Sequence, residues 1–498
     1  MSGWPAHPLL YEINTWPWLG EMSAAAGKPI TLADVPQSEL ERIGALGFDG
    51  VWLMGVWERS PEARDIASSL TDLLAEYQRA LPDFTAADVV GSPYAIHRYE
   101  VDATLGGGEA LAALRDRLRQ LGLRLILDFV PNHFAIDHPW LVEYPNRFVP
   151  ATADRHATAP QNYFTREIDG TSRTFAHGRD PNYNGWTDTV QLDYRTRDTR
   201  RALCELLAGI ADQCDGVRCD MAMLVIRDVF VRTWGGEFDP PDADFWSEAI
   251  GAVKVKHPAF VFVGEVYWDL EYRLQQLGFD YTYDKRLYDR LVDGDAQSVR
   301  DHLRASFEFQ RRLVRFIENH DEPRAVTTFG PERNRAAAVL ALTLPGMRLV
   351  HEGQIEGRHV KIPVQLGRRP AEPADLLMQA YYERLLQALS DPLSHEGAWQ
   401  LLDPRPAGIG ESHRGFIAHH WSSGDARRLV IVNWSPNQAQ CLLPLDVPAL
   451  AGTLWQLRDL LGAAEYQRHG EDLLNPGLYL DMPPYSYHLF EFQRPSLP

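Results

Sequence analysis

The residues of this chain that could do chemistry are acidic side chains placed at or just past the ends of short apolar runs. In chain order, these acids and their basic neighbours are Asp128, Arg218, Asp220, Glu265, His320 and Asp321. A buried carboxylate is costly in free energy unless it is paired. A purely structural role therefore explains poorly why acids recur at several run ends beside Arg or His. The pattern indicates one shared polar site.

Two carboxylates that flank one bond are what glycoside hydrolysis requires. In retaining enzymes the two lie about 5–5.5 Å apart, and one attacks the sugar while the other donates a proton. The proton donor needs a raised pKa, and a neighbouring carboxylate raises it by repulsion. Arg218 precedes Asp220 by two positions, so the two side chains share a face if the segment is a strand. We therefore expect Arg218 to keep the Asp220 carboxylate ionised.

Eight apolar runs, separated by amphipathic helical stretches, would position these side chains. The predicted strands are Leu9–Asn14, Gly50–Met54, Arg124–Val130, Gly216–Asp220, Phe260–Val266, Phe279–Tyr283, Arg312–Ile317 and Met347–His351. Strand–helix alternation predicts an α/β fold with a parallel sheet, and eight repeats favour a closed (β/α)8 TIM barrel over an open doubly wound sheet. In a barrel, polar residues just past the strand ends meet on the C-terminal face.

The chain divides into three predicted parts. Residues 1–133 and 195–396 form the barrel, residues 134–194 form an inserted subdomain after the third strand, and residues 397–498 form a C-terminal antiparallel β-sandwich domain. The insertion is a long connection, and long loops in compact domains usually serve a function. A second long connection, 60–98, contains a predicted helix at Ile66–Leu81. After Gly397 the apolar runs become short and alternating, which is typical of antiparallel strands.

Four sequence blocks resemble the signature regions of the α-amylase superfamily of glycoside hydrolases. The first region, D-x-x-x-N-H, is matched by Asp128, Asn132 and His133, and the second, G-x-R-x-D, by Gly216, Arg218 and Asp220. Glu265 matches the third region, and Asn319, His320 and Asp321 match the fourth. All four occur in order at barrel spacing, so the resemblance is specific and covers almost the whole chain.

The resemblance implies a retaining enzyme that acts on the α-glucosidic bonds of short α-glucans or glucosides. It implies Asp220 as nucleophile, Glu265 as general acid/base and Asp321 as the carboxylate that holds sugar hydroxyls. The implied substrate-binding residues are Tyr94, His133, Arg218, His320 and Arg324. For Arg324, a structural salt bridge is an equal alternative. No metal-binding motif is present, although Asn132 is either structural or a ligand of a structural calcium ion, as in some relatives.

One departure from the pattern bears on the substrate. Endo-acting amylases carry a Lys-His pair after the nucleophile, where this chain has Met223 and Leu224. Short substrates are therefore favoured over starch. Transglycosylation, isomerisation and phosphorolysis remain alternatives to hydrolysis within the superfamily. A non-catalytic carbohydrate- or partner-binding barrel is the alternative of another class, and the presence of all three carboxylates and Arg218 argues against it.

Composition limits the partners of this chain. Lys and Arg number 49 against 68 Asp and Glu, so the net charge is -19. Such a surface repels phosphate backbones, so we expect no nucleic acid partner, whereas a neutral sugar meets no such repulsion. The four cysteines form no CxxC pair, the first residues do not resemble a signal peptide, and no apolar stretch reaches the roughly 20 residues of a membrane span. We expect a cytoplasmic protein without membrane attachment, and the sequence predicts no particular oligomeric state.

Overall fold

A closed barrel of eight parallel strands forms the centre of the computed structural model, which describes residues 3–240 and 244–494. Around the barrel the strands are β1 (Leu9–Asn14), β15 (Met347–His351), β14 (Leu313–Arg315), β13 (Tyr281–Tyr283), β12 (Val261–Gly264), β11 (Gly216–Cys219), β5 (Arg124–Phe129) and β2 (Gly50–Met54). Every strand coincides with or lies inside a predicted one. The prediction of a closed barrel rather than an open sheet is confirmed.

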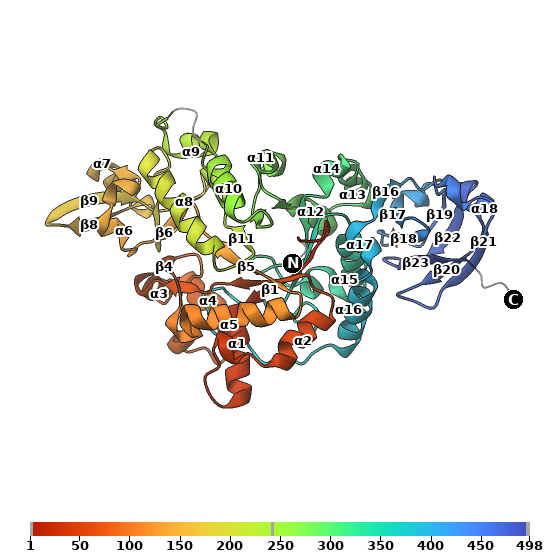
Figure 1. Cartoon of the computed structure of the whole chain (residues 1–498), viewed down its shortest axis with the longest axis horizontal. Helices are drawn as coiled ribbons and strands as arrows, with labels where there is room; N and C mark the ends of the chain where they lie inside the picture. The colour runs from red at the N-terminus through yellow and green to blue at the C-terminus, as the bar shows by residue number, and fades with distance from the viewer. Residues whose placement is uncertain (1–2, 241–243, 495–498) are drawn as a thin grey trace.

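Helices surround the barrel, as Figure 1 shows. They include α2 (Gln37–Ala45), α5 (Gly107–Gln120), α8 (Arg197–Ala211), α10 (Phe245–Lys256), α12 (Lys285–Asp293), α15 (Ala325–Thr343) and α16 (Leu376–Leu389). On α5, for example, the buried residues Leu111, Leu114 and Leu118 recur at helical spacing, so one apolar face of this helix covers the outside of the sheet. The second half of α15 is instead buried all round, from Ala336 to Thr343.

The helix predicted at Ile66–Leu81 is two helices, α3 (Pro61–Ala67) and α4 (Thr71–Ala80). The hydroxyls of Ser68 and Ser69 donate to the backbone oxygens of Arg64 and Ile66, both at 2.8 Å. Serine hydroxyls that bond to the preceding turn compete with helix continuation. The break allows α4 to run in a different direction from α3. Residues of α4 line a pocket.

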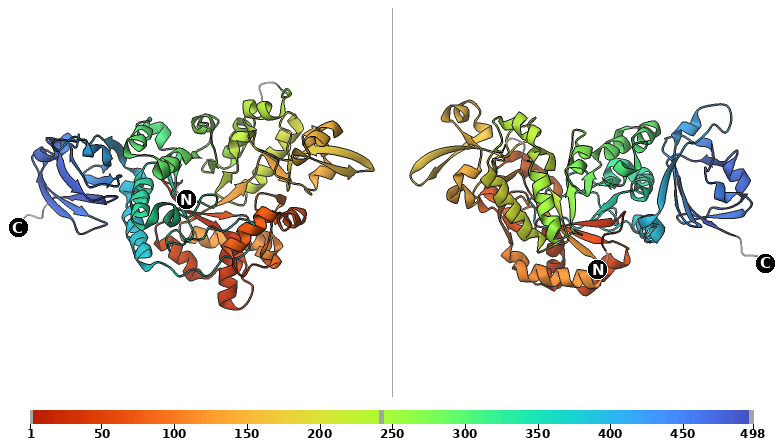
Figure 2. Two further views of the ribbon diagram at one scale, coloured as in Figure 1. Left: turned by 180° about the vertical axis from the view of Figure 1, so that it is seen from behind. Right: turned by 45° about the horizontal axis from the view of Figure 1, so that its top comes forward.

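The insertion after the third barrel strand has its own small sheets. At its base β6 (His133–Ala135) pairs with β10 (Thr189–Gln191) in antiparallel fashion. Farther out, β7 (Pro150–Ala151), β9 (Thr171–Ala176) and β8 (Tyr163–Ile168) form a three-stranded antiparallel sheet. The β8–β9 hairpin lies at one end of the elongated molecule and the C-terminal domain at the other (Figures 1 and 2).

The C-terminal domain contains two antiparallel sheets. The larger has the order β16 (Ala398–Leu402), β17 (Phe416–Ser423), β18 (Ala426–Asn433), β23 (Tyr487–Gln493), β20 (Leu454–Asp459) and β21 (Glu465–His469). The smaller pairs β19 (Ala439–Leu443) with β22 (Leu478–Met482), and both contribute to one buried cluster. Strands β16 and β21 were not predicted, because both lie at the edges of the sheet and carry few buried residues.

One face of the larger sheet packs on the barrel. Ile417 and Val430 belong to the same buried cluster as the barrel core. The indole nitrogen of Trp421 donates to the backbone oxygen of Thr343, at the end of α15, over 2.7 Å. The C-terminal domain is therefore joined to the barrel through a shared apolar core.

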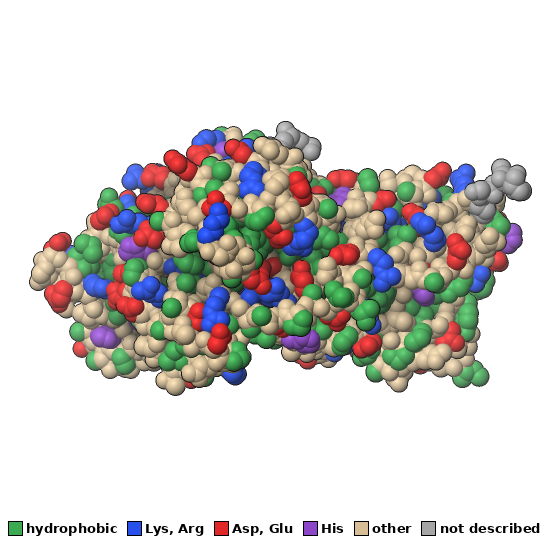
Figure 3. Space-filling model, turned by 90° about the horizontal axis from the view of Figure 1, so that it is seen from below, with side chains coloured by type: hydrophobic (Ala, Val, Ile, Leu, Met, Phe, Trp, Pro, Cys, Tyr) green, Lys and Arg blue, Asp and Glu red, His purple; other side chains and the backbone are tan. Residues whose placement is uncertain are grey.

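The surface shows no large area of one charge on the face seen in Figure 3, where basic side chains are interspersed with acidic ones. Within residues 3–240 and 244–494, no helix has both the length and the apolar character that crossing a bilayer requires.

Candidate active site

Two neighbouring barrel strands bring Asp220 and Glu265 together. Asp220 directly follows β11 and Glu265 directly follows β12, and the strands pair in parallel with Cys219 opposite Gly264. The ladder continues past both ends, since the Asp220 amide donates to Phe129 oxygen at 2.9 Å and the Glu265 amide to Cys219 oxygen at 3.0 Å. The two acids thus occupy equivalent positions on the C-terminal rim, where barrel active sites are found.

Arg218 bridges the two carboxylates. Its Nη1 lies 2.7 Å from Asp220 Oδ1 and its Nη2 lies 2.8 Å from Glu265 Oε2. The guanidinium carbon also lies 5.3 Å from the ring centroids of both Trp52 and Tyr94. A planar guanidinium can meet two acids at once, so one buried cation sets the distance between the pair.

The Glu265 carboxylate is held at both oxygens. The Met221 amide donates to Oε2 at 2.7 Å, and the Tyr267 hydroxyl donates to Oε1 at 2.8 Å. Met221 has a φ of 42°, in the left-handed region that costs a non-glycine residue free energy. Sequence reasoning missed both residues, although the two-residue spacing from Glu265 to Tyr267 was an available signal.

Asp321 sits in a chain of polar contacts that begins at β1. His320 Nε2 lies 3.0 Å from Asp321 Oδ2 and 2.6 Å from the Tyr94 hydroxyl, and its Nδ1 lies 2.5 Å from Glu12 Oε1. Glu12 is fully buried. Sequence reasoning missed Glu12 because it stands inside a strand without a motif. Its carboxylate orients the imidazole that contacts Asp321.

These contacts keep His320 positively charged and Asp321 negatively charged. Burial alone favours the neutral imidazole, but the Asp321 and Glu12 carboxylates raise the pKa of His320 to about 10. Burial likewise opposes ionisation of Asp321, but the His320 imidazolium holds the Asp321 pKa well below its usual range. At neutral pH Asp321 is therefore an anion beside a cation.

Asp220 behaves differently from the expectation that Arg218 keeps it ionised. Burial and the neighbouring Glu265 carboxylate raise the pKa of Asp220 to about 7, while Arg218 opposes the rise. The physical reason is that one guanidinium is shared between two carboxylates and cannot balance both. Asp220 is therefore partly protonated near neutral pH, and the ionised form that a nucleophile requires becomes dominant above that pH.

The three carboxylates Asp220, Glu265 and Asp321 face one cavity of about 400 Å³. The predicted residues on its wall are Tyr94, His133, Asp220, Glu265 and Asp321. Arg218 and His320 do not line this cavity; they are buried and contact its carboxylates. The structure thus brings together all three predicted catalytic residues and four of the five predicted substrate-binding residues.

The insertion supplies another part of the cavity wall. Trp186 and Asp188 line it, and the Trp186 ring centroid lies 5.1 Å from that of His133. Burial lowers the pKa of His133 to about 4, so its imidazole is neutral at pH 7. Burial raises the pKa of Asp188 to about 6. Sequence reasoning assigned neither Trp186 nor Asp188, because they come from an irregular segment without periodicity.

Arg324 does not reach the cavity. Its Nη1 lies 2.7 Å from Glu318 Oε1 and 2.7 Å from the backbone oxygen of Glu352, and only 3% of the residue is exposed. The structure favours the salt-bridge alternative over the expected substrate contact. Met223 and Leu224, which stand in place of the Lys-His pair, are buried in the turn after Asp220.

The first signature block has a structural role in two of its residues. Asp128 accepts from Trp52 Nε1 at 3.0 Å and from the Gly55 amide at 2.7 Å. Asn132 Oδ1 accepts from Gln191 Nε2 at 3.1 Å, so the proposed calcium donor is already engaged. Among the residues that the structure describes, no group of three or more His, Cys, Asp or Glu is arranged to hold a metal ion. Asn132 thus gives no support to a calcium site.

Comparisons with known proteins agree with this geometry. The family model described as alpha amylase, catalytic domain, matches residues 37–373. Alpha-amylase MalA of Haloarcula japonica is 25% identical over 456 residues, which cover 89% of this chain and 57% of that protein. Alpha-amylase 3 of Dictyoglomus thermophilum is 23% identical over 303 residues, 57% of each chain. The chain thus spans little more than half the length of these relatives.

Solved structures show the same fold along the whole chain. A maltogenic alpha-amylase, AmyB, from Thermotoga neapolitana has a TM-score of 0.69 at 18% identity and covers 98% of this chain and 99% of its own. An alpha-amylase from Geobacillus thermoleovorans has a TM-score of 0.68 at 18% identity and covers 100% of both chains. Since the family model spans more than half of the chain and includes Arg218, Asp220, Glu265 and Asp321, this chain belongs to the α-amylase family of glycoside hydrolases.

Proposed function

We propose that the chain is a retaining hydrolase of α-glucosidic bonds in short α-glucans or glucosides. The observation that carries this proposal is the bridge from one buried guanidinium to both Asp220 and Glu265, whose carboxylates face one cavity with Asp321. A retaining mechanism needs two closely spaced carboxylates, one ionised and one protonated. The shared guanidinium holds the two carboxylates close together, and the pKa of about 7 at Asp220 makes its ionised, nucleophilic form available above that pH.

The reaction proceeds in two displacements. Asp220 attacks the anomeric carbon while Glu265 donates its proton to the glycosidic oxygen, so the bond to the leaving group breaks and a glycosyl ester forms. Glu265 then takes a proton from water, which attacks the same carbon and releases the Asp220 carboxylate. Asp321 accepts hydrogen bonds from sugar hydroxyls and stabilises the positive charge that develops on the ring.

Two observations support short substrates. The segment after Asp220 presents only Met221 to the cavity, because Met223 and Leu224 are buried. The relatives also include proteins named Maltase 1 of Drosophila virilis and probable oligo-1,6-glucosidase 2 of Bacillus subtilis, at 24% and 23% identity.

Transfer to an acceptor other than water is the second candidate within the family. A protein named alpha-1,4-glucan:maltose-1-phosphate maltosyltransferase from Burkholderia pseudomallei is 29% identical over 290 residues, which cover 54% of this chain and 22% of that protein. Transfer would use the same glycosyl ester. Product analysis with and without added sugar or inorganic phosphate separates the two, because transfer consumes the acceptor.

The test is product analysis on a panel of α-glucosides: maltose, maltooligosaccharides, isomaltose, trehalose, sucrose and soluble starch. We expect turnover by the wild type, release of the α-anomer as first product by proton NMR, and loss of turnover in Asp220→Asn. Glu265→Gln should lose about 10²–10⁴-fold, the usual contribution of a general acid. Circular dichroism of each variant serves as the folding control.

Two outcomes would reject the proposal. A first product with the β-configuration would exclude retention, and full activity in Asp220→Asn would exclude the assigned nucleophile. Absence of turnover on the whole panel, together with sugar binding by calorimetry, would favour the non-catalytic barrel.

A cytoplasmic location is a further proposal. The four cysteines, Cys204, Cys214, Cys219 and Cys441, are free thiols, as is usual in reducing compartments. Cell fractionation with an antibody to the chain checks it. Structural calcium, suggested by the resemblance, has no support from Asn132, and an unchanged Tm after treatment with a chelator would exclude it.

A further inference from the structure

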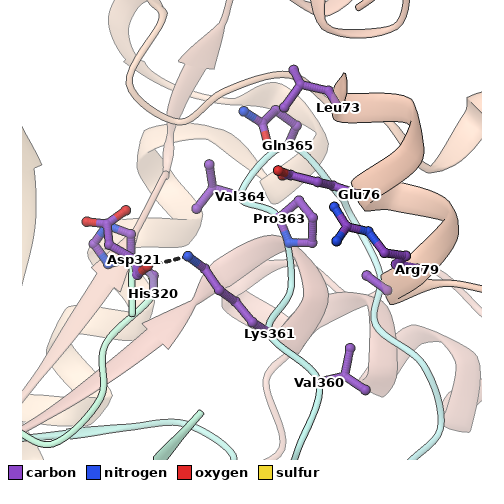
Figure 4. A pocket seen from close by; sticks show the side chains of 11 residues that line it. Leu73, Glu76, Arg79, His320, Asp321, Val360, Lys361, Pro363, Val364 and Gln365 are labelled. Atoms are coloured by element: carbon purple, nitrogen blue, oxygen red, sulfur yellow. Dashed lines mark hydrogen bonds and ion pairs between the residues drawn. The ribbon is translucent and has the colours of Figure 1, made fainter. Parts of the chain in front are cut away.

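A second pocket of about 490 Å³ adjoins the catalytic cavity. The two share Asp321, Val364 and Gln365 on their walls. The outer part of the second pocket is formed by α4 on one side and residues 360–365 on the other (Figure 4). Its volume falls in the range of about 300–1,000 Å³ that is common for ligand pockets.

The position of the second pocket relative to Glu265, the proposed general acid, determines which part of a substrate the pocket can hold. The leaving group must lie beside Glu265, which protonates the glycosidic oxygen. Glu265, Met221 and Tyr267 line the catalytic cavity and are not among the residues that line the second pocket. The second pocket therefore lies beyond Asp321, on the side of the sugar that is attacked, and would hold a unit attached to that sugar. This assignment rests on the proposed function.

Two cations, Lys361 and Arg79, line the second pocket. Lys361 Nζ donates to the backbone oxygen of Asp321, and Arg79 Nε donates to the backbone oxygen of Ala75 at 3.2 Å. Lys361 also acts on the Asp321 carboxylate and helps to lower its pKa, whereas Arg79 bonds to a backbone oxygen of its own helix. An ammonium has three donors and a guanidinium has five, so both groups keep unused donors. In the view of Figure 4, Lys361 and Arg79 flank Pro363.

One acid opposes these two cations. Glu76 lies three residues before Arg79 on α4 and lines the same pocket. No ion pair joins Glu76 to Arg79, so the guanidinium remains available. Besides His320 and Asp321, the charged residues that line the pocket are two cations, Lys361 and Arg79, and one acid, Glu76, in a protein of net charge -19.

We propose that the second pocket binds an outer sugar that carries an oxyanion, either a phosphate ester or a carboxylate. Arg79 can meet such a group through two parallel hydrogen bonds, and Lys361 can approach it as a point charge. The apolar side chains of Leu73 and Pro363 would contact the ring of the same sugar. The enzyme would then release an anionic disaccharide unit in preference to a neutral one.

The experiment compares para-nitrophenyl α-maltoside with three derivatives that differ only in the outer ring. In the outer ring, the hydroxymethyl group is replaced by a carboxylate, esterified with phosphate, or replaced by an aminomethyl group. The leaving group is therefore the same in all four compounds. We expect kcat/KM for release of the intact disaccharide unit to be about tenfold or more higher for the anionic donors than for the neutral one, as one charge-assisted hydrogen bond allows. The better of the two anionic donors distinguishes phosphate from carboxylate.

Three variants test whether the named residues cause the preference. Arg79→Gln and Lys361→Met should lower the ratio of anionic to neutral kcat/KM, and Glu76→Gln in the same pocket should raise it. Arg232→Gln, on α9 (Arg227–Trp234) and exposed, is the matched control and should leave the ratio unchanged. The ratio is used because Lys361 contacts Asp321, so its removal can also change the common rate.

Each outcome decides the inference. The inference would be overturned by equal rates for anionic and neutral donors or by a preference for the aminomethyl donor. It would also be overturned if Arg79→Gln and Glu76→Gln left the ratio of anionic to neutral kcat/KM unchanged. Turnover of para-nitrophenyl α-glucoside without turnover of any disaccharide donor would also overturn it, while the proposed function would stand. Failure on every donor, including the simple glucoside, would reject the proposed function itself.

Discussion

At the scale of single residues, the site depends on cations that are shared unequally among acids. Arg218 serves Asp220 and Glu265, whereas His320 lies between Glu12 and Asp321. Arg218 does not fully offset burial and the Glu265 carboxylate, so the pKa of Asp220 is raised. His320 is itself held as a cation, which keeps Asp321 ionised. Similar contacts thus raise the pKa of one carboxylate, Asp220, and lower that of another, Asp321.

The pH dependence of catalysis follows from the carboxylate pair. Asp220 attacks only when ionised, and burial together with Glu265 raises its pKa to about 7. Below that value the nucleophile becomes protonated, so kcat/KM should fall about tenfold per pH unit as pH decreases below 7. The measured value belongs to the pair.

Initial rates at low substrate concentration between pH 4 and pH 9 check this prediction. Circular dichroism over the same range separates it from unfolding. A kcat/KM that stays constant down to pH 5 would show that Arg218 keeps Asp220 ionised after all.

At the scale of elements, the parallel register of β11 and β12 places the two acids opposite each other. This register requires close packing behind the strand ends. A Cβ on Gly264 would lie 2.9 Å from Phe279 Cδ1 and 3.0 Å from Phe279 Cε1. Phe279 is fully buried, so its ring has little room to move.

Gly264→Ala should therefore displace β12 or Phe279. We expect a loss of about 1–3 kcal/mol in the free energy of unfolding, the usual cost of overpacking. We also expect a lower kcat, because Glu265 follows Gly264 directly. Gly251→Ala on α10 is the matched control, since no atom lies within 4 Å of its added Cβ. Urea unfolding and kcat that are alike in both variants would contradict the packing argument.

At the scale of the whole molecule, the barrel depends on its C-terminal domain for part of its core. Trp421 on β17 has 3% of its surface exposed, bonds to Thr343 and lies 5.2 Å from the His7 ring. His7 lies two residues before β1, so this contact joins the segment before the first barrel strand to the C-terminal domain.

Trp421→Ala should cost about 3–5 kcal/mol of stability, because it leaves a large cavity between the domains. The kcat/KM of the folded variant should be unchanged, since Trp421 does not line the catalytic cavity. Thermal unfolding and activity well below the Tm test both statements. Tyr479→Ala, at a half-exposed position on β22, should change the Tm little. A similar loss of Tm in the two variants would contradict a stabilising role for the contact between the barrel and the C-terminal domain.

Local pattern was enough to predict the barrel and the acids that meet at its cavity. Buried strands are continuous apolar runs, and each run ends where a polar residue follows, so strand ends and site residues appear together in the sequence. The two-residue spacing of Arg218 and Asp220 predicted that their side chains lie on the same face of a strand. Segments without such periodicity were missed or misjudged, as with the edge strand β21 and the serine break between α3 and α4.

Tertiary structure decided what depends on residues far apart in the chain. Glu12 reaches His320 across 308 residues, and Arg324 turned out to bond to Glu318 and Glu352 instead of lining the cavity. The Asp220 pKa depends on burial and on Glu265, neither of which is visible in a one-dimensional pattern. The second pocket likewise exists only because α4 lies beside residues 360–365. Periodicity reports the environment of each element, but only closure of the barrel determines which charges share a cavity.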